Sequence, residues 1–362
     1  MERTHFISRA GLATLAALLA LTAFATAQAS AAAPKSFFGI NATLPTDGDY
    51  KRMGKAGFGA YRFDMNWAGI QTKRKGGYDW NGPDAAVRHA ATNGMQPVPL
   101  LIGTPKFVKK NADGLYPPTK EKEDRQAWQS FAGEAAKRYG PGGVFWSQNP
   151  DVPEIPIKKW LVWNEQNAAA FWKPRPNPRD YATLVKLTDR GISQEQPQAK
   201  ISLGGMFGYP QNDSSPTAVN FLRKFYAVNG IEKHFEAIAV HPYGSGVSTV
   251  KTQIEEARKA AKRAGDRNVG IIVGELGWAS NGPKSAEEVV GSKGQANRLK
   301  KGLNLLANKR RSWNIENVFV YVWRDFPPEL TACLWCPKAG LLKENGDEKP
   351  AFKAVRKVLK GG

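Results

Sequence analysis

Short apolar runs alternate with longer amphipathic segments along most of the chain. The runs are rich in β-branched and aromatic residues, and they predict eight strands, over residues 36–42, 60–67, 96–103, 159–165, 200–206, 235–243, 270–278 and 317–326. The segments between them repeat apolar residues with a helical period, and several end on glycine. They predict helices over residues 84–94, 125–140, 179–191, 216–230, 247–265, 295–310 and 349–361.

This alternation of elements indicates parallel βαβ units, and strands that are apolar on both faces indicate a sheet covered by helices. A strand count of eight matches the (β/α)8 TIM barrel, an α/β fold. The alternative is a doubly wound open sheet, which often carries a glycine-rich phosphate loop after its first strand. Residues 39–49, "GINATLPTDGD", contain no such loop, so we predict the barrel.

Two long irregular stretches interrupt the pattern, at residues 103–124 and 139–160. In a barrel the first follows a strand and lies on the face where active sites form, whereas the second lies on the opposite face. The first stretch is rich in lysine. We expect it to border a substrate groove, with a surface insertion of no functional role as the alternative.

The N-terminal residues have the layout of a secretory signal peptide. Arg3 and Arg9 precede an apolar run over residues 11–25, and small residues follow at once. A membrane anchor is the alternative, but the run is shorter than the ~20 apolar residues that span a bilayer. We therefore expect residues 1–33 to be removed. The domain at residues 34–362 is then secreted, into the periplasm or the medium, without stable membrane insertion.

The chain of 362 residues is strongly basic, with a formal net charge of +20. Removal of residues 1–33 leaves 50 basic against 31 acidic side chains, a balance of +19. Such a charge favours polyanionic partners such as acidic polysaccharides, although solvated helix faces also explain it. No zinc-finger spacing or RNP-type strand is present, so we expect no nucleic acid partner.

The two cysteines, Cys333 and Cys336, lie in "ACLWCPKAG". In an oxidising compartment we expect them to form a disulfide. A metal site would need more ligands, and no histidine lies near them in the sequence. A thioredoxin-like redox site would need a helix after the second cysteine, but proline and glycine follow. We expect neither a metal nor a cofactor.

Polar residues gather where the predicted strands end, and these ends form the active site of a barrel. Two of them, Glu165 and Glu275, end the fourth and seventh strands and would face each other across the mouth. Cleavage of a glycosidic bond needs such a pair, one carboxyl protonated and the other ionised. Arg62, at the end of the second strand, would favour the ionised form of one of them.

Each strand-end residue also has a plainer interpretation. A single glutamate there often serves as a helix cap or an ion-pair partner. His241, which precedes a proline, could pack in a turn, and Trp323 could belong to the core. Two glutamates at matching strand ends are harder to explain in this way, and they carry the catalytic interpretation.

Several of these segments resemble glycoside hydrolases of clan A, particularly families 39 and 5. Residues 160–174, "WLVWNEQNAAAFWKP", are similar to the acid/base segment, in which family 39 has Trp-Asn-Glu-Pro-Asn followed by Phe-Trp. Gln166 replaces the usual proline. "VHPYG" at residues 240–244 and "VGELGW" at residues 273–278 resemble the sixth- and seventh-strand signatures. The resemblance extends over nearly the whole chain after the signal peptide.

The resemblance implies a role for each matching residue. Glu165 would be the general acid/base and Glu275 the nucleophile of a retaining reaction, with carboxylates about 5 Å apart. The expected substrate-binding and positioning residues are Arg62, Asn164, His241, Tyr243, Trp278 and Trp323, the last as the floor under the sugar. Trp67 and Trp172 would be outer platforms for further sugars.

The sequence therefore predicts a secreted, monomeric, retaining glycoside hydrolase acting on a β-linked glycan. The basic charge adds the hypothesis that this glycan is acidic. Two alternatives stay open. One is a carbohydrate-binding protein on the same scaffold without turnover. The other is a transglycosylase that uses the same residues and differs only in the acceptor.

Overall fold

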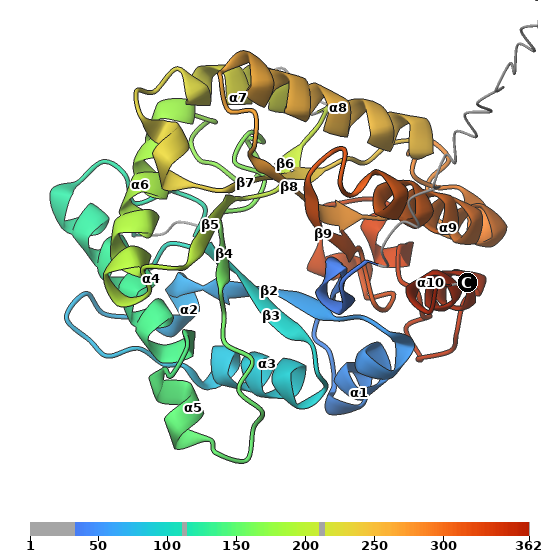
Figure 1. Ribbon diagram of the computed structural model, residues 1–362, viewed down its shortest axis with the longest axis horizontal. Helices are drawn as coiled ribbons and strands as arrows, with labels where there is room; N and C mark the ends of the chain where they lie inside the picture. Colours follow the sequence, from blue (N-terminus) through green and yellow to red (C-terminus); the bar gives the residue numbers. More distant parts are fainter. Residues whose placement is uncertain (1–32, 111–113, 210–213, 362) are drawn as a thin grey trace, which may run out of the picture. The chain divides into compact units, whose positions relative to one another are not determined.

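The strands form one parallel sheet that closes on itself, as seen in a computed structural model that describes residues 33–110, 114–209 and 214–361 (Figure 1). Within these residues the strands are β1 (Phe38–Asn41), β2 (Ala60–Asn66), β3 (Gln96–Ile102), β4 (Lys159–Val162), β5 (Lys200–Leu203), β6 (Met206–Phe207), β7 (Ala237–His241), β8 (Gly270–Leu276) and β9 (Ile315–Val320). Each of the eight predicted segments contains or overlaps a strand, and the segment at residues 200–206 reaches both β5 and the first residue of β6. The predicted (β/α)8 barrel is confirmed.

The ring follows the order of the chain from β1 to β5, and β1 pairs with β9 on its other side. It closes between β5 and β7 through the pairing of Ser202 with Ala237. The two-residue β6 pairs with β7 and adds no further position to the ring. A separate cluster of buried apolar side chains comes entirely from the strands: Ala60, Val98, Leu100, Leu161, Ala237, Ala239, Ile272 and Phe319.

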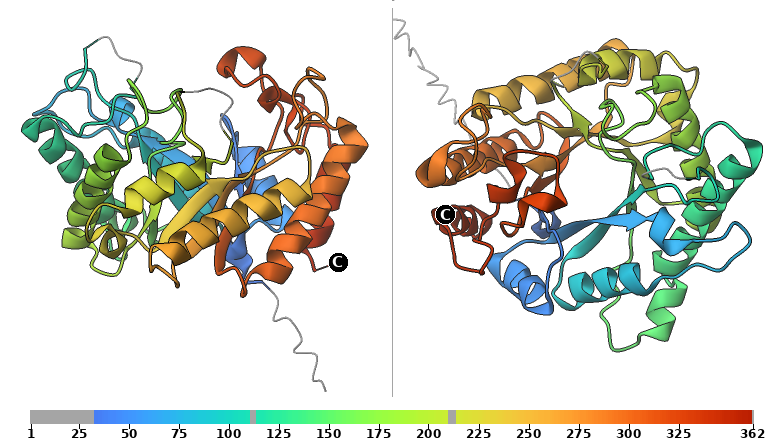
Figure 2. Two further views of the ribbon diagram at one scale, coloured as in Figure 1. Left: turned by 90° about the horizontal axis from the view of Figure 1, so that it is seen from above. Right: turned by 180° about the vertical axis from the view of Figure 1, so that it is seen from behind.

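Helices surround the strands on the outside (Figures 1 and 2). They are α1 (Asp47–Ala56), α2 (Trp67–Ile70), α3 (Asn81–Thr92), α4 (Lys122–Tyr139), α5 (Val144–Gln148), α6 (Pro178–Glu195), α7 (Ala218–Tyr226), α8 (Val247–Arg263), α9 (Gly291–Lys309) and α10 (Pro350–Leu359). Short 3-10 turns lie at Lys35–Phe37, Ile231–His234, Pro328–Leu330 and Cys336–Lys338. Among the described helices, none combines the length and apolarity needed to cross a bilayer.

Helix α1 was not predicted. It begins with a capping box, in which Thr46 accepts a hydrogen bond from the Asp49 backbone and Asp49 accepts one from the Thr46 backbone. Its buried apolar side chains, Tyr50, Met53 and Ala56, are too few to produce a strong periodic pattern. The Thr-x-x-Asp spacing was the signal that could have located its start.

Strand β4 is shorter than predicted and ends at Val162 rather than at Glu165. Trp163 and Glu165 have φ angles of 66° and 41°, in the left-handed region that a strand cannot continue through. The backbone therefore turns away from the sheet directly before the candidate acid/base. Such conformations are costly for residues other than glycine and are common at functional sites.

All described elements belong to one compact unit, Ala32–Gly362. The domain boundary predicted at residue 34 stays a prediction, and residues 1–32 of the predicted signal peptide lie outside the described part. The left view in Figure 2 shows that the loops after the strands gather along one edge of the barrel. The strand-end residues therefore come together at that edge.

Candidate active site

Glu275 lies near the end of β8, where the pairing of β8 with β9 shifts in register between Val273 and Leu276. Both of its carboxylate oxygens accept hydrogen bonds. Arg62 Nη1 donates to Oε1 at 2.8 Å, and the hydroxyl of Tyr243 donates to Oε2. The side chains of Arg62 and Glu275 are 5% and 13% exposed, so this ion pair is shielded from water.

The electrostatic surroundings favour the ionised form of Glu275. Burial raises the pKa of this carboxyl, but electrostatic interactions with His241 and Arg62 lower it. Hydrogen bonds from Tyr243 and Arg62 act in the same direction, and the resulting pKa lies below the ordinary value for glutamate. Burial and the neighbouring Glu275 carboxylate raise the pKa of Tyr243 well above its ordinary value, so the phenol keeps its proton as a donor.

Glu165 follows β4 in a segment that is bonded to the neighbouring loop after β5. The Glu165 N–H donates to the carbonyl of Gly205 at 2.8 Å. Gln166, which stands where the similar family 39 segment has proline, is fully buried, and its amide donates to the carbonyl of Gly204 at 3.0 Å. Proline has no side-chain donor, so a proline at this position could not hold the segment by such a bond.

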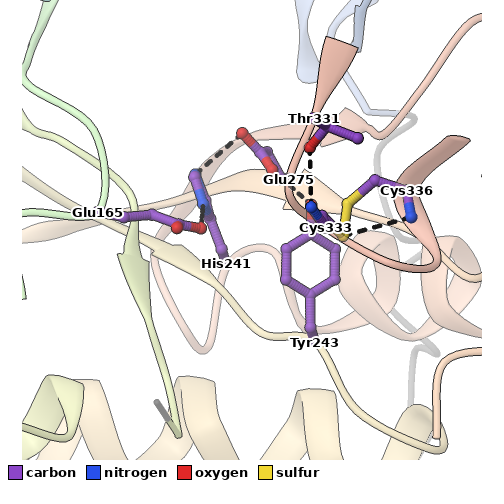
Figure 3. The surroundings of a disulfide bond; sticks show 7 residues. All are labelled: Glu165, His241, Tyr243, Glu275, Thr331, Cys333 and Cys336. Carbon is purple, nitrogen blue, oxygen red and sulfur yellow. Dashed lines mark hydrogen bonds and ion pairs between the residues drawn. A yellow bond between two sulfur atoms is a disulfide. The ribbon is translucent and has the colours of Figure 1, made fainter. Parts of the chain in front are cut away.

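His241 lies between the two glutamates. Its Nδ1 is 2.8 Å from Glu165 Oε1, and its Nε2 is 3.7 Å from Glu275 Oε1 (Figure 3). The ring is fully buried against two glycines. A Cβ added at Gly205 would lie 1.8 Å from Nε2, and one added at Gly274 would lie 2.8 Å from it. Only glycine leaves room for the imidazole at these two positions.

The two carboxylates approach closely. One oxygen of Glu165, one of Glu275 and a ring nitrogen of His241 all lie within 4.8 Å of one another. Among the described residues this is a group whose spacing could also hold a metal ion. However, both oxygens of Glu275 already accept hydrogen bonds, and Arg62 supplies positive charge at that point. The donor set therefore suits a reacting carboxylate better than a cation.

The remaining predicted polar residue, Asn164, joins the same network. Its Oδ1 accepts a hydrogen bond from Arg62 Nη2 at 2.9 Å. Asn41, at the end of β1, was not predicted and accepts from Arg62 Nη1 at 3.0 Å. The structure thus brings Arg62, Asn164, Glu165, His241, Tyr243 and Glu275 together at one end of the barrel.

These residues lie at the floor of a cleft of about 960 Å³. Its lining includes Arg62, Asn164, Glu165, Tyr243 and Glu275 together with aromatic rings at Tyr61, Phe63, Phe171, Phe207, Tyr321, Phe326 and Trp335. A smaller hollow of about 630 Å³ adjoins it and shares Asp64, Asn66 and Phe171. Apolar walls with a few convergent polar groups are typical of a ligand site.

Asp64 lies in both hollows, two residues beyond Arg62 on β2. Desolvation by the surrounding protein raises its pKa, although the side chain remains open to the cleft. Arg62 opposes this shift and Glu275 adds to it. Within the described residues, no hydrogen bond or ion pair to the Asp64 side chain is present.

The chain shares its fold with family 39 glycoside hydrolases. A family 39 glycoside hydrolase from Bacteroides cellulosilyticus WH2 superposes with a TM-score of 0.63 at 18% identity, over 90% of this chain and 63% of that one. A monomeric β-xylosidase from Caulobacter crescentus CB15 gives 0.65 at 16% identity, over 90% and 68%. Xylanase 10B from Thermotoga maritima gives 0.63 at 15% identity, over 90% and 95%.

These likenesses are structural, since the identities are low. The chain spans less than two thirds of the family 39 structure from Bacteroides cellulosilyticus. No family model and no curated protein sequence matches the chain.

The predicted tryptophan platforms are wrong. Trp323 and Trp278 are each 1% exposed, and neither lines the cleft. The Trp323 indole points toward α1 and donates to Asp49 Oδ1 at 2.8 Å, while the Trp278 indole donates to the Gly244 carbonyl at 2.7 Å. Both are core residues, because each indole is turned into the protein and bonded there rather than directed at the cleft. Trp67 and Trp172 are buried as well.

Aromatic residues other than the predicted tryptophans line the cleft. Tyr321 directly follows β9 and lines the cleft, and Trp335 comes from the loop beyond it. Trp335 lies between Cys333 and Cys336, which are joined by the predicted disulfide. A tryptophan enclosed by two bonded cysteines was the sequence signal that could have identified it.

The lysine-rich stretch at residues 103–124 borders the smaller hollow rather than the main cleft. Gly103, Thr104 and Lys106 line that hollow. No lysine is among the described residues that line the main cleft. The lysine-rich stretch therefore borders a hollow next to the main cleft and not the part of the cleft that holds Glu165 and Glu275.

Proposed function

We propose that this chain is a retaining glycoside hydrolase that cleaves a β-linked glycan by double displacement. The observation that carries the proposal is the carboxylate pair, whose oxygens approach within 4.8 Å at the floor of an aromatic cleft. Retaining enzymes place their carboxyl groups about 5–5.5 Å apart, whereas inverting enzymes need about 6.5–9.5 Å for a water molecule. The fold shared with glycoside hydrolases supports the same function.

In the first step Glu275 attacks the anomeric carbon of the bound sugar. Arg62 and Tyr243 hold both of its oxygens and keep it ionised. Glu165 donates a proton to the oxygen of the leaving group as the bond to the anomeric carbon breaks. Asn164 accepts from Arg62 through Oδ1, which leaves its amide nitrogen to donate to the sugar 2-hydroxyl.

In the second step water replaces the sugar's ester bond to Glu275. Glu165, now ionised, takes a proton from this water, which attacks the anomeric carbon and releases Glu275. His241 Nδ1 contacts Glu165 Oε1 and fixes the direction of that carboxyl through both steps. The product keeps the β configuration of the substrate.

We propose an uncharged glycan as the substrate rather than the acidic one that the net charge suggested. The charged residues that line the main cleft are one arginine and four carboxylates: Arg62, Asp64, Asp79, Glu165 and Glu275. The arginine is already paired with Glu275. A carboxylated or sulfated sugar would meet net repulsion in the cleft, whatever the charge of the outer surface.

Export of the chain also belongs to the proposal. The sequence of residues 1–33 predicts a signal peptide, and the disulfide between Cys333 and Cys336 suits an oxidising compartment. Export is checked by N-terminal analysis of the protein recovered outside the cytoplasm, which should begin near residue 34. A monomer remains the expected state.

The test is hydrolysis of a panel of β-linked glycans, with the anomeric configuration of the first product followed by NMR. We expect β products from the wild type. Glu165→Gln should lower kcat about 10²- to 10⁴-fold, the usual contribution of a general acid/base, and Glu275→Gln should abolish turnover. Glu287→Gln, an exposed glutamate outside the cleft, is the matched control and should cleave as the wild type does.

Each other outcome assigns the chain differently. Binding of a glycan without cleavage by the wild type would identify a carbohydrate-binding protein. Transfer to a second sugar in preference to water would identify a transglycosylase. Full activity of Glu275→Gln, or an α product, would overturn the proposed mechanism.

A further inference from the structure

Trp335 lies in an edge-to-face contact with Tyr243, the residue that donates to Glu275. The ring centroids are 4.8 Å apart and the planes are inclined by 71°. Trp335 also contacts Tyr321, with centroids 6.1 Å apart. The indole is 9% exposed and lines the cleft, so it forms part of the wall directly beside the candidate nucleophile.

The loop that carries Trp335 is held in place at several points. The disulfide joins the residues on either side of Leu334 and Trp335. Beyond it, the carbonyl of Pro337 accepts from the Phe326 N–H at 3.2 Å, and the carbonyl of Lys338 accepts from the Ser280 N–H at 3.0 Å. The loop that carries the indole is therefore fixed to the segments that follow β8 and β9.

Tyr243 depends on its neighbours for the position of its ring. Its hydroxyl donates to Glu275, and its backbone carbonyl accepts from Gln253 Nε2 at 2.7 Å. The ring itself is held by other rings. Those of Phe207, His241 and Tyr321 each lie 6.2 Å away, and Trp335 is the nearest of the described rings (Figure 3 shows the disulfide beside Tyr243 and Glu275).

We propose that Trp335, fixed by the Cys333–Cys336 disulfide, is a positioning residue that holds Tyr243 in the orientation from which it donates to Glu275. The inference rests on the proposed role of Glu275 as nucleophile. It assigns to the disulfide loop a function in catalysis and not only in stiffening the chain. It also explains why a tryptophan with so little exposed surface lies at the cleft wall.

The consequence concerns the ionisation of Glu275. Six titratable or charged side chains face this carboxylate: Arg62, Asp64, Glu165, His241, Tyr243 and Tyr321. Trp335 contacts two of them, Tyr243 and Tyr321, and of these two only Tyr243 donates a hydrogen bond to the carboxylate. If the phenol moves away, Glu275 loses a hydrogen bond that stabilises its ionised form, and its pKa rises. The nucleophile is then protonated at a higher pH, so activity is lost earlier on acidification.

The test compares Trp335→Ala with the wild type in the pH profile of kcat/KM. We expect the acid limb to move to higher pH and kcat to fall up to about tenfold, the size of one aromatic pair contact. KM should change less than about threefold, because Trp335 acts through Tyr243. Trp335→Phe keeps an aromatic contact and should recover most of kcat. Leu334→Ala, 72% exposed in the same loop, should match the wild type.

A second comparison tests whether Trp335 acts on Glu275 through Tyr243. In a Tyr243→Phe background, Trp335→Ala should cause no further shift of the acid limb, because the hydroxyl it positions is gone. Replacement of both cysteines by serine should shift the limb in the same direction as Trp335→Ala. Thermal unfolding of every variant separates these effects from loss of the fold.

The inference fails if Trp335→Ala changes only KM, which would make Trp335 a sugar platform. It also fails if only the unfolding temperature changes, or if the shift persists in the Tyr243→Phe background. Titration of ¹³C-labelled glutamate carboxyls by NMR, with Glu275 assigned by the loss of its signal in Glu275→Gln, measures the same shift without turnover. A shift there together with no glycan cleavage would overturn the proposed function while retaining the Trp335–Tyr243–Glu275 linkage.

Discussion

Arg62 joins residues from three other parts of the barrel. Its guanidinium donates to Asn41 at the end of β1, to Asn164 after β4 and to Glu275 on β8. A planar group with several donors in fixed directions is needed to reach all three at once, and lysine lacks this geometry. The residue therefore orients Glu275 and Asn164, the proposed nucleophile and the proposed sugar-binding residue, together.

Replacement of Arg62 by glutamine should raise the pKa of Glu275, because a positive charge and a hydrogen bond are lost. A carboxyl with a depressed pKa contributes stability above its unfolded pKa, near 4.3, and loses it as the pH falls through the folded pKa. The acid limb of kcat/KM should therefore move to higher pH. The free energy of unfolding at pH 7 should fall by about 3–5 kcal/mol, since the buried Glu275 loses its ion-pair partner.

Arg62→Lys serves as the control, because it keeps the charge but loses the geometry. We expect it to preserve more stability than Arg62→Gln while losing kcat to a similar extent. Urea unfolding and pH–rate profiles measure both effects. An unchanged acid limb in Arg62→Gln would show that the remaining partners alone keep Glu275 ionised.

The polar residues of the site could be predicted from the sequence because strand ends in a barrel meet at one face. The same reasoning placed Glu165, Glu275 and Arg62 at the mouth. It failed for Trp323 and Trp278, because an aromatic residue near a strand end fits the core as well as the cleft. Periodicity does not tell these two environments apart, whereas in the structure the two indoles donate to Asp49 and to the Gly244 carbonyl within the core.

At the scale of elements, a buried ion pair joins the segment after β9 to the start of α10. Lys349 Nζ lies 2.6 Å from Asp325 Oδ1 and also donates to Ser280 Oγ and the Lys338 carbonyl. Burial lowers the pKa of Lys349 and raises that of Asp325, while their hydrogen bond opposes both shifts. Through its bond to the Lys338 carbonyl, Lys349 thus ties the C-terminal side of the disulfide loop to Asp325.

Lys349→Met should lower the free energy of unfolding by about 3–5 kcal/mol, because Asp325 stays buried without its partner. Adding Asp325→Asn should restore part of this loss, since the amide oxygen can still accept from the Gly340 N–H. Urea unfolding at pH 7 measures both. Lys343→Met, whose ion pair with Asp347 is exposed, should cost less than about 1 kcal/mol. An equal loss in Lys343→Met and Lys349→Met would contradict the role of burial.

The elements themselves were predictable where their apolar patterns were long. Helix α6 (Pro178–Glu195) and strand β3 (Gln96–Ile102) lie close to their expected ranges. Helix α1 was missed because it buries few apolar side chains, and β4 was extended too far. The positive φ angles at Trp163 and Glu165 that end β4 leave no trace in a hydrophobic pattern.

At the scale of the whole molecule, the sign of the charge differs between the chain and its cleft. The chain carries a formal net charge of +20, whereas four of the five charged residues that line the main cleft are carboxylates. Charge on the outer surface acts on association over the screening length of the solution. Recognition inside the cleft depends on the nearest groups instead.

An uncharged β-glycan should therefore be cleaved with a kcat/KM at least about tenfold above that of its carboxylated counterpart, because like charges repel in the cleft. Raising the salt from about 0.01 M to about 1 M shortens the screening length from about 30 Å to about 3 Å. It should leave the rate on the uncharged glycan nearly unchanged. Asp64→Asn should reduce the ratio of kcat/KM on the uncharged glycan to kcat/KM on the carboxylated glycan. A preference for the carboxylated glycan that disappears with salt would restore the acidic substrate.

The contact between His241 and Glu165 lies close to the point where the barrel closes. β5 and β7 meet through the single pairing of Ser202 with Ala237, so the ring has a seam there. Glu165 is anchored to Gly205 on one side of the seam, and His241 belongs to β7 on the other. The contact between His241 and Glu165 therefore links the two sides of the ring where β5 and β7 share only one residue pairing. A change in the separation of the strands at this joint would change the distance between Glu165 and Glu275, the proposed proton donor and nucleophile.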